Sequence, residues 1–163
     1  MPGVIKAHLG SPQVSRVIYG AIIGLALIVA LEDHPPSPGV VAATLLGTAV
    51  AVGLAELYSD YVGTETRTRR HLRDGEVRDI AYDAVAVAFG IAFPVAFFVL
   101  AAAHAIEEDT AFTIAKWSGL ALIGVYGFCA ARLAGESVPW SVLRALAVGL
   151  IGAFLIALKA LVH

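Results

Sequence analysis

Residues 14–38 read VSRVIYGAIIGLALIVALEDHPPSP and contain both the element that decides the fold and the signal that ends it. An apolar run extends from Val14 to Leu31, and the sequence EDHPP follows it directly. Two acids and two prolines cannot continue a helix through lipid. The stretch therefore predicts a membrane helix that ends at an aqueous surface.

The composition of the whole chain favours lipid as its solvent. Of the 163 residues, 59% are hydrophobic and 15% are charged, whereas soluble domains carry about 25% charged residues. The charges fall into short blocks, and the runs between them are long enough to cross a bilayer core, which takes about 20 helical residues. There is no Walker loop, GxGxxG, CxxC or HExxH motif, so we expect no enzymatic activity.

Five apolar runs predict an all-α membrane protein with five transmembrane helices in a single transmembrane domain, residues 1–163. Each run must be helical, because backbone groups inside lipid have to bond within their own segment. Gly20 and Gly24 have the spacing typical of close helix packing. The expected helices lie at about residues 14–31, 39–62, 80–106, 112–133 and 138–162.

Lysine and arginine placement orients these helices. Lys6 and Arg16 stand before or at the start of the first run, and further arginines lie in the alternate connections. The opposite loops, 32–38 and 107–110, contain no lysine or arginine. Because positive residues concentrate on the cytoplasmic side, the sequence predicts a cytoplasmic N-terminus and an external C-terminus.

The connection 64–79 is predicted to be a short basic cytoplasmic loop. It is too short for a domain, and its alternating charges indicate that it prolongs the flanking helices as a solvated hairpin. Its acids interrupt its arginines, so we expect membrane lipid and no nucleic acid as a partner. The arginines are Arg67, Arg69, Arg70, Arg73 and Arg78.

Three carboxylates lie where burying a charge is costly. Glu56 is the deepest, about 10 Å inside the cytoplasmic end of the second run. Asp60 follows one turn later on the same helical face, and Asp83 enters at the start of the third run. Carboxylate oxygens suit divalent cations and also carry protons. We therefore expect Glu56, Asp60 and Asp83 to form a metal site that faces the cytoplasm.

A structural interpretation stands beside this one. Asp60 and Asp83 lie within a turn of the interface, where an arginine at 16, 67 or 78 provides a partner by snorkelling. Four tyrosines at similar depth either complete an oxygen-rich pocket or form an interfacial belt. These are Tyr19, Tyr58, Tyr61 and Tyr82. Pro94 should kink the third helix and free a carbonyl, which serves either a transport path or packing.

Several motifs, taken in order, resemble those of the vacuolar iron transporter family. Residues 55–59, AELYS, look like the G-E-Y-x-S stretch of its second helix, with Glu56 on the family's acid. Residues 90–94, GIAFP, are similar to its third-helix G-G-x-x-P element. Residues 127–135, GFCAARLAG, resemble the G-x-x-x-G-R-x-x-G that ends its fourth helix. Gly149 and Gly152 fall where its last helix has a glycine cluster.

The resemblance implies a small homodimeric transporter that exchanges a divalent cation, such as iron or manganese, for protons. Glu56 would bind the ion or exchange a proton, and no cofactor is expected beyond the transported metal ion. Together with the residue pattern, the resemblance places four residues along the transport path. They are Tyr19, Tyr58, Gly90 and Pro94.

The chain also departs from the family. Tyr19–Gly20 stands where the first helix of the family has Asp-Gly, and Val52 stands where its second helix has a methionine. The cytoplasmic metal-binding helices of many members are absent, so the chain resembles a divergent short member. The loss of a carboxylate and a soft thioether ligand weakens the expected selectivity for ferrous iron.

Two other functions therefore remain open. The chain could be a transport-inactive membrane scaffold or partner-binding protein, in which Glu56 is buried in a hydrogen bond to a neighbouring helix. It could also be a channel or carrier for protons or another ion. In each case we expect an integral membrane protein, and the outer loops without lysine or arginine fit a bacterial plasma membrane.

Overall fold

The computed structural model describes residues 13–162, without the side chains of residues 148, 151–153 and 155–162. Within this part of the chain every regular element is a helix, which confirms the predicted all-α class. Lys6, one of the positive residues that predict the orientation, lies outside the described residues. The helices are α2 (Gln13–Leu31), α3 (Pro38–Thr68), α4 (Asp74–Ala92), α5 (Val95–Ala102), α6 (Glu108–Leu133) and α7 (Val138–Val162).

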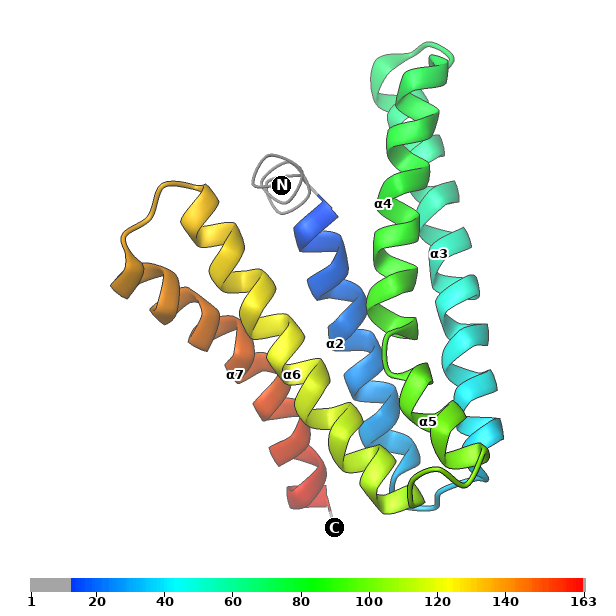
Figure 1. Ribbon diagram of the computed structural model, residues 1–163. Coiled ribbons are helices and arrows are strands. Elements are labelled where there is room, and N and C mark those ends of the chain that lie inside the picture. The colour runs from blue at the N-terminus through cyan, green and yellow to red at the C-terminus, as the bar shows by residue number, and fades with distance from the viewer. Residues whose placement is uncertain (1–12, 163) are drawn as a thin grey trace.

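Several of these helices are long and apolar enough to cross a membrane. Among the described residues they are α2, α3 and α6, and the number rises from 3 to 4 when the bent pair of α4 and α5 is counted as one span. Figure 1 shows the helices running alternately between two ends of the molecule, with the last helix ending opposite the start of α2. This supports an integral membrane protein, whereas a fifth crossing by α7 stays a prediction.

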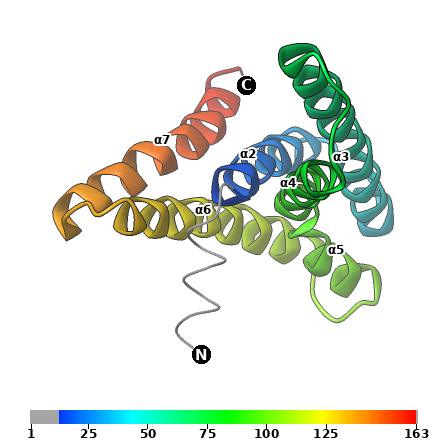
Figure 2. The same cartoon turned by 90° about the horizontal axis from the view of Figure 1, so that it is seen from above.

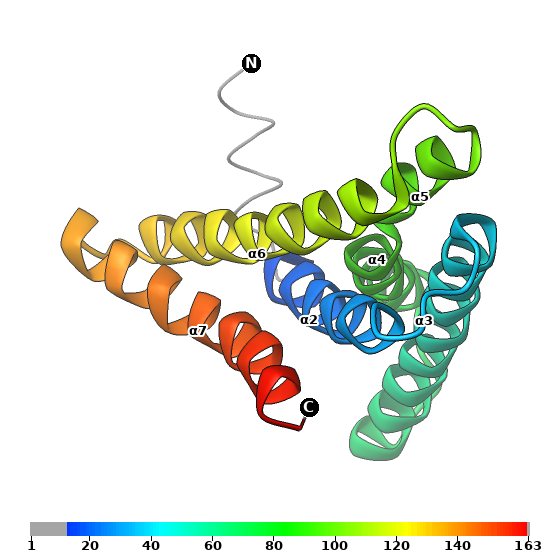
Figure 3. The same cartoon turned by 90° about the horizontal axis from the view of Figure 1, so that it is seen from below.

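The central helix of the bundle is α2. It packs against α4 on one side and α6 on the other, while α3 covers α4 and α7 covers α6. Seen from either end of the bundle, α3 and α7 therefore lie at opposite edges (Figures 2 and 3). The first apolar run, residues 14–31, thus forms the centre of the fold.

The contact between α2 and α4 depends on glycine. A Cβ atom added to Gly90 would lie within 3.0 Å of backbone atoms of Val17, Gly20 and Ala21, and one added to Gly20 would collide with the backbone of Val87. Gly24 continues the contact one turn further along α2, where an added Cβ would be 3.1 Å from the Ile91 carbonyl oxygen. Small residues let two backbones approach this closely, as the Gly20–Gly24 spacing predicts.

Pro94 separates α4 from α5, and the two helices are bent by 43° at this break. The predicted kink is therefore present. Proline has no N–H, so it cannot donate the usual helical hydrogen bond to the carbonyl of Gly90. The helix predicted over 80–106 begins earlier, at Asp74, and ends earlier, at Ala102, where the chain turns through His104 with a positive φ of 58°.

A hydrophobic cluster holds the end of the bundle where α5 lies. Ile28, Leu45 and Phe98 are fully buried there, and Phe112 is 2% exposed. The rings of Phe98 and Phe112 meet edge to face with centroids 4.9 Å apart, a geometry that aromatic pairs prefer. This cluster joins four helices and fixes α5 against α3 and α6.

At the other end, α3 and α4 project past their neighbours (Figure 1). The 31 residues of α3 span about 46 Å, more than the core of a bilayer, which is about 30 Å thick. The projecting part consists of the end of α3, residues 64–68, the turn after it and the start of α4, residues 74–79. The predicted helical hairpin is therefore present, and α3 runs past the predicted limit of Val62. We call this side of the bundle the hairpin end.

Candidate functional site

One arginine faces three carboxylates at the hairpin end. The guanidinium of Arg16 on α2 forms an ion pair with Glu56 of α3, and its Nη2 lies 2.6 Å from Oδ2 of Asp60 on the same helix. Its Nε lies 3.7 Å from Oδ2 of Asp83 on α4. Three helices therefore meet around one positive charge. We call these four residues the Arg16 cluster.

The local structure of each helix explains how the cluster forms. Glu56 and Asp60 are four residues apart, so they point from the same face of α3. Asp83 faces them because α4 packs between α2 and α3. Arg16 lies near the start of α2, and its long side chain reaches all three acids. The four side chains are 18–31% exposed, so water still reaches the cluster.

The structure brings together the three acids that the sequence predicts as a metal site. It also selects among the three arginines proposed as partners, because Arg16 pairs with both Asp60 and Asp83. Within residues 13–162, no group of three or more His, Cys, Asp or Glu side chains is arranged to hold a metal ion. The guanidinium of Arg16 pairs with all three acids and balances one of their three charges.

The predicted pocket of tyrosines is dispersed. The hydroxyl of Tyr61 donates to Oε1 of Glu65 at 3.3 Å, toward the hairpin. Tyr82 lines a cleft of about 520 Å³ between α2, α4 and α6, together with Tyr126 and Gln13. Tyr19 and Tyr58 are 46% and 70% exposed on the surface of this chain. No charged side chain lines that cleft, so it is separate from the Arg16 cluster.

The two remaining residues predicted for the transport path lie on or beside α4. Gly90 is buried in the contact with α2, and Pro94 follows at the break before α5. Gly90 thus has a packing role that the sequence did not assign to it. Whether it also lines a path stays a prediction.

Lys116 is a charged residue that the sequence analysis missed. Its Nζ forms an ion pair with Glu32, at the end of α2 opposite the Arg16 cluster. Arg16 and Glu32 are 16 residues apart, which is about 24 Å along a helix. An ion pair thus holds each end of α2. The sequence does contain a signal for this residue: Lys116 is a charged residue inside the apolar run 112–133, just as Glu56 is inside the run 39–62.

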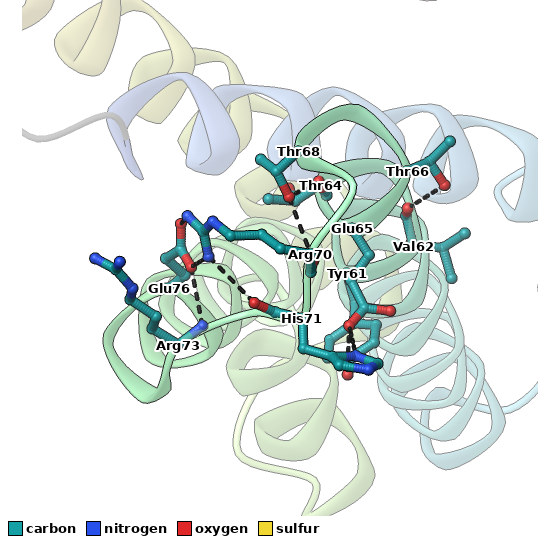
Figure 4. A network of polar contacts seen from close by, with 10 residues as sticks. All are labelled: Tyr61, Val62, Thr64, Glu65, Thr66, Thr68, Arg70, His71, Arg73 and Glu76. Atoms are coloured by element: carbon teal, nitrogen blue, oxygen red, sulfur yellow. Dashed lines mark hydrogen bonds and ion pairs between the residues drawn. The ribbon is translucent and has the colours of Figure 1, made fainter.

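The polar side chains of the hairpin bind one another (Figure 4). Arg70 donates two hydrogen bonds of 2.8 Å to the carboxylate of Glu76, which also accepts the backbone N–H of Arg73 at 2.9 Å. His71 lies 2.9 Å from Glu65. The Arg70 guanidinium and then the Arg73 N–H lower the pKa of Glu76 to about 2, and Glu76 raises the pKa of Arg70. These contacts close the hairpin, and none of them involves a residue of the Arg16 cluster.

Comparison with known proteins adds no family. No protein-family model matches the chain, and neither curated proteins nor solved structures give a match.

Proposed function

We propose that this protein is a membrane transporter that exchanges a divalent cation for protons through the Arg16 cluster. The observation that carries the proposal is the charge balance of the cluster, in which one guanidinium faces three carboxylates. With all groups ionised, its formal charge is −2. A partly buried excess of this kind is costly near lipid, so protons or a cation relieve it.

Protons and divalent cations are the two species that an exchanger binds in turn. Three carboxylates offer the oxygen ligands that hard and borderline divalent cations prefer, and each of them also accepts a proton. Glu56 has the lowest exposure of the cluster, 18%, and stands on the acid of the motif that resembles the iron transporter family. We assign it the central role and take iron(II) or manganese(II) as the substrate class.

The proposed topology places the cluster on the cytoplasmic side. The hairpin end carries Arg16 and all five loop arginines, which under the positive-inside rule corresponds to the cytoplasm. With α7 as a fifth span, the N-terminus is cytoplasmic and the C-terminus external, in a bacterial plasma membrane. Cations then reach Asp60 and Asp83 first and pass along Tyr19, Tyr58 and the break at Pro94.

The proposed unit is a homodimer that pairs through α3. Seven small residues recur every fourth position along this helix, and all of them are exposed in the single chain. Such a ridge allows two helices to approach closely in lipid. It also adjoins Glu56 and Asp60, so pairing would bring the two clusters toward a shared axis. The ridge consists of Gly39, Ala43, Gly47, Ala51, Ala55, Ser59 and Gly63.

A cysteine at the middle of this ridge tests the dimer. In a Cys129→Ala background, which removes the native cysteine, Ala51→Cys should give a covalent dimer when membranes are treated with a mild oxidant. Val125→Cys, at a position 58% exposed on α6, should stay monomeric on the same non-reducing gel. Pairing through α3 is contradicted if only Val125→Cys forms a covalent dimer, or if neither variant forms one.

A second candidate function is a transport-inactive membrane scaffold. The pairing of Glu56 with Arg16 of a neighbouring helix favours it, because a partly buried acid with a fixed structural partner needs no ion. The transporter and the scaffold differ in whether they account for the two additional carboxylates, because a purely structural ion pair with Arg16 needs only one acid.

Flux measurements separate the candidates. We expect the purified protein in proteoliposomes to take up manganese(II) and iron(II), and an imposed pH gradient to accelerate uptake and to be dissipated by it. A scaffold gives the flux of empty liposomes under every condition. Proton flux without metal flux would identify a proton channel or carrier instead, and would overturn the exchange proposal.

A further inference from the structure

We infer that Arg16 is a tethered competitor for the cation site, so that an entering cation binds only by displacing its guanidinium. The inference rests on the proposed function, because it concerns the regulation of the same carboxylates. It assigns Arg16 two consequences: it sets the affinity of the site, and it selects for divalent over monovalent cations.

The contacts of Arg16 support occupation of the site. Its three guanidinium nitrogens divide among the acids, with Nη1 on Glu56, Nη2 on Asp60 and Nε toward Asp83. Both Asp60 and Glu56 come from α3, whereas Arg16 comes from α2 and Asp83 from α4. The one positive group thus lies at the point where all three acids converge, and the acids are spaced around a planar fork instead of a single ion.

The position of Arg16 makes displacement feasible. It lies three residues after the start of α2 at Gln13, and its side chain is 29% exposed. A long arginine side chain at a membrane interface readily directs its charged head to water. Released from the acids, the guanidinium therefore moves into the aqueous phase, and the three carboxylates are then available to draw together on a cation.

Competition with the single positive charge of Arg16 selects for divalent over monovalent cations. A monovalent cation brings no more charge to the carboxylates than the guanidinium that it must replace, and it lacks the directed hydrogen bonds of arginine. A divalent cation brings twice the charge, and the Coulomb energy scales with that charge. Arg16 therefore excludes sodium and potassium, the abundant monovalent ions, while it admits manganese(II) or iron(II).

Removal of the competitor gives a direct test by binding, independent of transport. Manganese(II) alone is titrated into the purified protein in lipid nanodiscs, and bound ion is followed by electron paramagnetic resonance. We expect Arg16→Gln to bind manganese(II) about tenfold more tightly than the wild type or better, and to gain more thermal stability from it. Sodium chloride should weaken this binding in Arg16→Gln and have less effect in the wild type.

Arg144→Gln is the matched control. It makes the same change in a residue 57% exposed that pairs with Glu136 between α6 and α7, and its affinity for manganese(II) should equal that of the wild type. Arg16→Lys keeps the charge but replaces the fork by one ammonium, so it should tighten binding by a smaller factor. This variant also serves if Arg16→Gln fails to fold.

Unchanged or weaker manganese(II) binding in Arg16→Gln, or in Arg16→Lys if only that variant folds, overturns the inference. It would show that Arg16 assembles the site instead of competing for it. The proposed function fails by a different result, the absence of proton-coupled flux in the wild type. Tighter binding in Arg16→Gln would stand even then, because the titration needs no transport.

Discussion

Proton-coupled uptake of manganese(II) is expected to fall to the level of empty liposomes when Glu56 is replaced by glutamine. The change removes one negative charge and one proton site from the least exposed member of the cluster. A neutral amide is a poor ligand for a divalent cation and carries no exchangeable acid proton. Both halves of the proposed exchange would therefore be lost together.

The fold should survive this substitution. The amide oxygen of glutamine still accepts a hydrogen bond from Arg16, whose pairing with Asp60 is retained. The charge imbalance of the cluster also becomes smaller, so we expect the thermal unfolding temperature to be unchanged or raised. Glu136→Gln is a matched control, because it makes the same change in a carboxylate of the connection between α6 and α7, which pairs with Arg144. That variant should transport at the rate of the wild type.

Measurement of manganese(II) influx and of the internal pH in the same proteoliposomes distinguishes the outcomes. Influx retained by Glu56→Gln would contradict a central role for this carboxylate. Proton movement retained without metal influx would restrict Glu56 to cation binding and assign proton exchange to Asp60 or Asp83. Loss of both, with an unchanged unfolding temperature, is the expected result.

The sequence locates the acids of the cluster but not the partner that they share. Depth along a helix can be counted from the ends of an apolar run, and this count singles out Glu56. The rotation of one helix relative to another cannot be counted in this way. The sequence therefore leaves three equivalent partners, Arg16, Arg67 and Arg78. Only the packing of α2 beside α4 and α3 decides for Arg16.

The same distinction explains the other outcomes. Pro94 breaks the third helix where expected, because the missing N–H is a property of the residue itself. The tyrosines separate because a similar depth does not imply a shared face: Tyr61 reaches Glu65, whereas Tyr82 lines the cleft beside α6. The role of Gly90 in packing depends on a second glycine, Gly20, that is distant in sequence.

Gly90→Ala should therefore destabilise the whole bundle, and not only a transport path. An added methyl group would lie 2.6 Å from the backbone nitrogen of Ala21 and within 3.0 Å of the carbonyl carbon of Gly20. These are backbone atoms, which cannot rotate away, so α2 and α4 must move apart. Overpacking of this kind costs about 1–3 kcal/mol and sometimes more. We expect a loss of about 3 kcal/mol, or about 10 °C in the unfolding temperature.

Gly124→Ala is the control for this effect. Gly124 is also a glycine inside a membrane helix, but an added Cβ would meet nothing within 4 Å. Alanine is the better helix former by about 0.5–1 kcal/mol, so this variant should unfold at the same or a higher temperature than the wild type. Equal unfolding temperatures for Gly90→Ala and the wild type would show that the α2–α4 contact is looser than the structure has it.

Because α2 carries Arg16 and α4 carries Asp83, separation of these helices should also abolish the 3.7 Å approach of the two charges. The stability of the bundle and the geometry of the cluster therefore depend on the same glycine contact.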